Sequence, residues 1–126
     1  MAEGDSIWRG GCHCGALRFE VQGEVSGVEL CNCSICAMKA YVHWYVPRET
    51  FTLVRGEADL ATYQFGTRAA RHHFCRVCGV APFYVARSDP DKIDVNLRCV
   101  EGIDLDSLEM ARFDGRHWEE AFAKRS

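Results

Sequence analysis

Long apolar runs and clusters of basic residues are both missing from this sequence of 126 residues. No run approaches the ~18 apolar residues of a membrane-spanning helix, so we expect no membrane span. Lysine and arginine form no run and the formal net charge is −3, which argues against nucleic-acid binding. The first six residues have neither the basic nor the apolar region of a secretory signal, which favours a cytoplasmic protein.

Linkers, low-complexity segments and repeats of fixed period are missing as well. The length is that of one domain, so we expect a single domain over residues 1–126. Hydrophobic residues make up 48% of the chain and charged residues 26%, which is typical of a globular protein with a modest core.

Helix-forming patterns are scarce, whereas short alternating or β-branched segments recur between turn residues. These segments predict strands at residues 17–21, 28–30, 41–46, 51–54, 61–65, 71–74, 81–85 and 93–97. A spacing of ~8–12 residues with turns between predicts a mainly β domain built of antiparallel sheets. Helix is expected only as one turn at 34–39 and as a short terminal helix at 117–124.

Cysteine, in contrast, is abundant and clustered. Seven of the eight cysteines lie two or three positions apart, in three clusters: Cys12 and Cys14; Cys31, Cys33 and Cys36; Cys75 and Cys78. Such neighbours bridge to each other with difficulty but converge readily on one ion, so the spacing favours thiolate coordination of zinc. Disulfides are the first alternative, disfavoured because no export signal is visible. For the middle cluster, an iron–sulfur cluster is a further alternative.

The first and third clusters share a feature that the middle one lacks. Each ends in Cys-Gly, with Gly15 and Gly79 placed to adopt the positive φ that a zinc-binding turn often needs. We therefore pair these two clusters in a closed, structural zinc site with four ligands: Cys12, Cys14, Cys75 and Cys78.

The middle cluster offers three thiolates, from Cys31, Cys33 and Cys36. Three protein ligands leave one position of a tetrahedral zinc open for water or substrate, which is the arrangement of a catalytic site. The alternative is that Cys99 supplies a fourth ligand and closes the site. The sequence leaves both interpretations standing.

Three histidines lie near these clusters. His43, in the most apolar strand, is either a buried, hydrogen-bonded side chain or a general base or proton shuttle. His72 and His73 precede the third cluster, and in a strand one of them would face inward and the other outward.

Three segments together carry a resemblance to a known family: Gly-Gly-Cys-His-Cys-Gly-Ala-Leu-Arg-Phe-Glu at 10–20, Cys-Asn-Cys-Ser-Ile-Cys at 31–36 and Phe-Cys-Arg-Val-Cys-Gly at 74–79. They resemble the glutathione-dependent formaldehyde-activating enzyme family, whose animal branch includes centromere protein V. The resemblance covers residues 8–120 and implies an Mss4-like (β-tent) fold with antiparallel sheets around zinc.

The resemblance also implies chemistry. It implies two zinc ions per chain: a structural one on Cys12, Cys14, Cys75 and Cys78, and a catalytic one on Cys31, Cys33 and Cys36. The implied activity is that of a carbon–sulfur lyase, which reversibly joins formaldehyde and glutathione. Arginines such as Arg48 or Arg68 would then hold the carboxylates of the thiol.

Two other functions remain as alternatives. One is a zinc-stabilised binding module of the centromere protein V type without catalysis. The cysteine at position 99 resembles that branch of the family. The other is zinc or redox handling without turnover, because an open thiolate site is reactive. The sequence does not indicate an oligomeric state.

Overall fold

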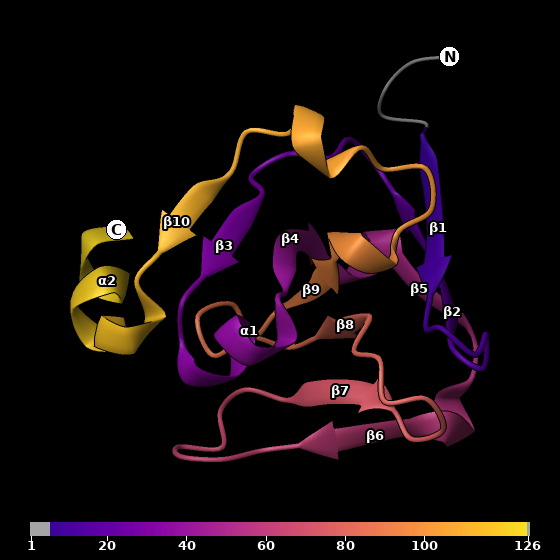
Figure 1. Cartoon of the computed structure of the whole chain (residues 1–126), viewed down its shortest axis with the longest axis horizontal. Coiled ribbons are helices and arrows are strands. Elements are labelled where there is room, and N and C mark those ends of the chain that lie inside the picture. Colours follow the sequence, from indigo (N-terminus) through magenta and orange to yellow (C-terminus); the bar gives the residue numbers. More distant parts are fainter. Residues whose placement is uncertain (1–5, 126) are drawn as a thin grey trace.

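The computed structural model describes residues 6–125 of the chain (Figure 1). Its strands are β1 (Ile7–Gly11), β2 (Arg18–Gln22), β3 (Glu29–Cys31), β4 (Val42–Pro47), β5 (Phe51–Arg55), β6 (Leu60–Tyr63), β7 (His72–Cys75), β8 (Phe83–Tyr84), β9 (Lys92–Asn96) and β10 (Ala111–Phe113). Its α-helices are α1 (Ser34–Lys39) and α2 (Trp118–Arg125), beside short 3₁₀ turns. The prediction of a mainly β chain with little helix is confirmed. Within residues 6–125, neither α1 nor α2 has the length and apolarity to cross a membrane.

The strands form three sheets. One has the order β1-β2-β5, the largest has the order β10-β3-β4-β9-β8, and β6 pairs with β7 alone. The pairs are antiparallel except for β10 with β3, which run parallel. Strand β4 lies at the centre of the largest sheet and is buried along most of its length, which explains its continuous run of aromatic and β-branched residues.

The main core lies between the two larger sheets. The ring of Phe19 in β2 stacks on Phe51 in β5, with 5.5 Å between centroids, and Phe83 in β8 meets Phe51 at 4.8 Å. Buried aliphatic side chains surround these rings, among them Val21 and Val95, both fully buried. The sheets are therefore fixed against each other, and the loops at their ends are held in place.

Two of these loops carry the first and third cysteine clusters. The turn from β1 to β2 is closed by the amide of Cys12 donating to the carbonyl of Leu17, and the turn after β7 by the amide of Cys75 donating to Val80. The two turns lie side by side in Figure 1, at the same end of the molecule. The middle cluster lies elsewhere, where β3 ends and α1 begins.

Candidate metal centres and cavity

Four sulfurs from the two turns come together. The ligand atoms of Cys12, Cys14, Cys75 and Cys78 all lie within 4.8 Å of one another, with 3.6 Å between the sulfurs of Cys12 and Cys14 and 3.7 Å between those of Cys14 and Cys75. Gly15 and Gly79 both have a φ of 82°, the positive value predicted for them.

The backbone supports this four-thiol group. The amide of Leu17 donates to the sulfur of Cys12 at 3.3 Å, and the amides of Val77 and Cys78 donate to the sulfur of Cys75 at 3.4 and 3.5 Å. Amide hydrogen bonds of this kind stabilise thiolates, which are the form that binds a metal.

The donor set fits zinc. A tetrahedral ion with Zn–S bonds of about 2.3 Å requires sulfurs about 3.8 Å apart, close to the spacing between Cys14 and Cys75. A set of four soft thiols is the donor set of a structural zinc site.

A second group consists of three sulfurs. Cys31 ends β3, Cys33 caps the start of α1, and Cys36 lies inside that helix, which places the three ligand atoms within 4.8 Å of one another. The amide of Cys36 donates to the sulfur of Cys33 at 3.4 Å. Hydrogen bonds from the thiols of Cys31 and Cys36 hold the pKa of Cys33 well below its usual range. This three-thiol group therefore favours at least one thiolate at neutral pH.

Cys99 belongs to neither group within the described residues. It lines a hollow together with Cys12, and burial, followed by the charges of Cys12 and Cys78, raises the pKa of its thiol to about 11. Cys99 thus neighbours the four-thiol group, and the structure does not bring it to Cys31, Cys33 and Cys36 as the alternative required.

The three-thiol group opens onto the main cavity of the molecule. This cavity has a volume of about 740 Å³ and is lined by residues from within segments 31–38, 65–72, 84–88 and 113–118, together with Tyr45. A space of this size holds a ligand of a few hundred daltons. The four-thiol group does not line it.

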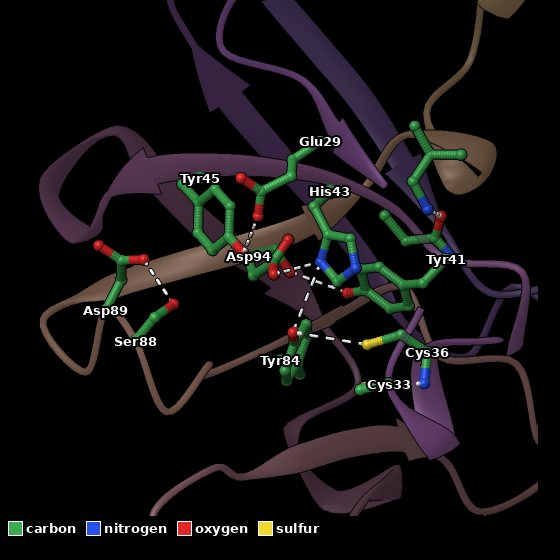
Figure 2. A network of polar contacts seen from close by, with 12 residues as sticks. Glu29, Cys33, Cys36, Tyr41, His43, Tyr45, Tyr84, Ser88, Asp89 and Asp94 are labelled. Carbon is green, nitrogen blue, oxygen red and sulfur yellow. Dashed lines mark hydrogen bonds and ion pairs between the residues drawn. The ribbon is translucent and has the colours of Figure 1, made fainter. Parts of the chain in front are cut away.

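A chain of buried polar groups reaches the three-thiol group from the core (Figure 2). The hydroxyl of Tyr84 lies 3.9 Å from the sulfur of Cys36 and 3.5 Å from Nδ1 of His43, which in turn lies 2.6 Å from a carboxylate oxygen of Asp94. Burial raises the pKa of Asp94. Nε2 of His43 and Oδ1 of Asp94 have no hydrogen-bond partner among the described residues, so this pair costs folding free energy.

The fold agrees with comparisons to known proteins. The profile of the glutathione-dependent formaldehyde-activating enzyme family matches residues 7–113. The chain belongs to this family. It is also similar to a Rhodobacter sphaeroides protein of known crystal structure, at 35% sequence identity and a TM-score of 0.74, over 82% of this chain and 97% of that one.

The three histidines predicted near the cysteine clusters lie at different positions relative to the cavity. His43 is fully buried and does not line the cavity, so it reaches the cavity only through neighbours that do, Tyr84 and Tyr45 among them. His72 does line it, stacked on Tyr84 with 4.9 Å between ring centroids, and burial lowers its pKa to about 4. His73 alternates away and pairs with Thr62 at 2.8 Å. The predicted alternation along β7 therefore holds, and His72 is the inward residue.

The arginines that line the cavity are not those that the sequence suggested. Arg48 donates to the carbonyl of Pro90, and neither it nor Arg68 lines the cavity. Arg87 and Arg116 do. Arg116 follows the matched family region, and no local pattern marks either residue, because the wall they share is formed by segments about 30 residues apart in sequence.

Proposed function

We propose that this protein is a zinc-dependent carbon–sulfur lyase that reversibly joins formaldehyde to a small thiol, resembling S-(hydroxymethyl)glutathione synthase. The observation that carries the proposal is the three-thiol group of Cys31, Cys33 and Cys36, which faces a cavity of about 740 Å³ and has no fourth protein thiol beside it in residues 6–125. Three ligands and an open side are the arrangement of a catalytic zinc.

The reaction makes modest demands on the protein. Cleavage of the adduct breaks its carbon–sulfur bond, and the electron pair leaves on sulfur while the hydroxyl loses its proton and becomes the carbonyl of formaldehyde. Nothing is oxidised or reduced. The site must therefore stabilise one thiolate and accept one proton, and joining the two compounds reverses both steps.

The residues at hand meet these demands. Zinc held by the three thiols would supply a Lewis acid that favours the thiolate form of a substrate thiol at neutral pH. His72 is the proton acceptor in this proposal because it lines the cavity, and its imidazole is neutral there, although the lowered pKa makes it a weaker base than an ordinary histidine. Tyr84 holds the sulfur of Cys36 through its hydroxyl, and the pair of His43 and Asp94 fixes Tyr84 from behind.

Apart from the presence of Cys99, nothing in residues 6–125 favours binding without catalysis of the centromere protein V type. The formal net charge is −3, and the cysteines of the three-thiol group face a hollow suited to a small molecule rather than a flat surface.

The test is the rate at which zinc-loaded protein forms and cleaves S-(hydroxymethyl)glutathione, measured by NMR above the uncatalysed background. We expect catalysis by the natural protein and its loss in Cys33→Ala. Cys99→Ala is the matched control, since it removes a thiol outside both groups. A natural protein with no rate above background, or an equally active Cys33→Ala variant, contradicts the proposal.

A further inference from the structure

One wall of the cavity comes from residues that follow the matched family region, which ends at residue 113. Gly115, Arg116 and Trp118 all line the cavity. In Figure 1 this segment leads from β10 into α2, beside β3. Part of the cavity wall is therefore formed by residues outside the region that the family profile matches.

Hydrogen bonds with one residue, Asn32, fasten this segment to the three-thiol group. Asn32, between Cys31 and Cys33, donates from Nδ2 to Asp114 at 2.9 Å and accepts at Oδ1 from the amide of Arg116 at 3.1 Å. Nε of Arg116 also donates to the carbonyl of Asn32 at 3.0 Å. Three hydrogen bonds between the same few residues fix the wall relative to the thiols.

The contact is close as well as polar. A Cβ atom at Gly115 would lie 2.5 Å from the sulfur of Cys31 and 2.7 Å from Cβ of Cys33. Only glycine allows the backbone to approach the thiols to this extent. The wall and the three thiols therefore form one unit, and what the wall binds lies near the reacting sulfur.

Two guanidinium groups line this part of the cavity. Arg87 lies over the ring of Trp118, 3.6 Å from its centroid, and donates to Glu119 at 2.8 Å. Arg116 makes no ion pair with a carboxylate in the described part of the chain. Among the described residues that line the cavity, none is aspartate or glutamate. Apart from the thiolates, the charged side chains that line the cavity are these two arginines, and Arg87 is already paired with Glu119.

We propose that Arg116 and Arg87 bind a carboxylate of the substrate thiol and so select thiols that carry one over uncharged thiols. This inference rests on the proposed function for the identity of the site. Guanidinium groups suit carboxylates because they donate two parallel hydrogen bonds. Stacking on Trp118 and the hydrogen bond to Asn32 hold the two side chains in place before substrate arrives, which lowers the entropy cost of binding.

The experiment measures the affinity of zinc-loaded protein for glutathione and for its diethyl ester, whose carboxylates are blocked, by titration calorimetry at low salt. We expect the natural protein to prefer glutathione by about tenfold, as for a partly exposed charge-assisted pair. Arg116→Gln and Arg87→Gln should each reduce this preference. Arg112→Gln, which removes the same charge from an exposed arginine outside the cavity, should keep it.

Each outcome separates the two proposals. Equal affinity for acid and ester in the natural protein, or an unchanged preference when both cavity arginines are replaced, overturns the carboxylate site even if lyase activity is present. A preference that depends on the arginines in a protein without lyase activity supports the site and contradicts the proposed function. Binding of neither compound overturns the site.

Discussion

The four-thiol group joins turns whose cysteines lie 61 positions apart, between Cys14 and Cys75, whereas the three-thiol group comes from one stretch of six residues. With zinc bound, the first would close a long loop, as a disulfide does, and would contribute to the stability of the whole fold. The second is held locally by the end of β3 and the start of α1. Such a group can leave one side open, because the fold does not depend on a fourth ligand.

The largest expected effect is on folding: loss of a cysteine from the four-thiol group should unfold the protein, and loss of one from the three-thiol group should not. Cys75 is fully buried in the four-thiol group, so Cys75→Ser should release its zinc and prevent folding, because structural zinc contributes ~10–16 kcal/mol, as much as a domain's whole stability. Cys33→Ser should keep the fold and lose only one zinc. Circular dichroism and zinc content measure both. A folded Cys75→Ser variant would show that the four-thiol group is dispensable.

Substitution of Gly115 should disturb the three-thiol group alone. The Cβ of Gly115→Ala would lie 2.5 Å from the sulfur of Cys31, so the sulfur or the wall must move. We expect zinc affinity at this group to fall by ~10–100-fold, the usual effect of disturbing a ligand's surroundings. Competition with a chelator measures the affinity, and the zinc of the four-thiol group serves as the internal control. Equal weakening of both groups would contradict the separation.

Removal of the Tyr84 hydroxyl tests the buried chain of polar groups. Tyr84→Phe deletes the group 3.9 Å from the sulfur of Cys36 and should weaken zinc binding at the three-thiol group by about tenfold. The matched control is Tyr45→Phe, which also removes a hydroxyl from the cavity wall, one that donates to Glu29. Equal zinc release rates in the two variants would show that the hydroxyl of Tyr84 does not support zinc binding at the three-thiol group.

The smallest effect concerns pH. Burial lowers the pKa of His72 to about 4, so the imidazole remains neutral well below the ordinary histidine value of about 6.5. We expect the activity to stay flat from about pH 7.5 down to pH 6 in the natural protein. His72→Gln should reduce the rate across this range. A loss of half the activity near pH 6.5 would mean that a histidine with an ordinary pKa carries the proton instead.

Local sequence signals predicted much of this molecule, because they depend on neighbouring residues. The Cys-Gly pairs predicted both the positive φ of Gly15 and Gly79 and the meeting of their turns. Alternating residues predicted β2 and β9 within one residue at each end. Strand β1, which ends in two glycines, and the short parallel strand β10 had no such signal. Their pairing partners, not their own residues, make them strands.

The cavity could not be predicted either, because it too depends on residues that are distant in the sequence. Its walls come from four separate segments, so Arg87, Arg116 and His72 meet only in the folded chain. His43, a predicted candidate near the cysteines in sequence, lies in the central strand β4 and is buried in the core.

The most direct test of the account counts the sulfurs around zinc by X-ray absorption spectroscopy of the fully loaded protein, with and without glutathione. An open three-thiol group predicts an average below four sulfurs per zinc, which rises to four when the thiol is added. An average of four before any thiol is added would mean that both groups are closed, and it would contradict the account.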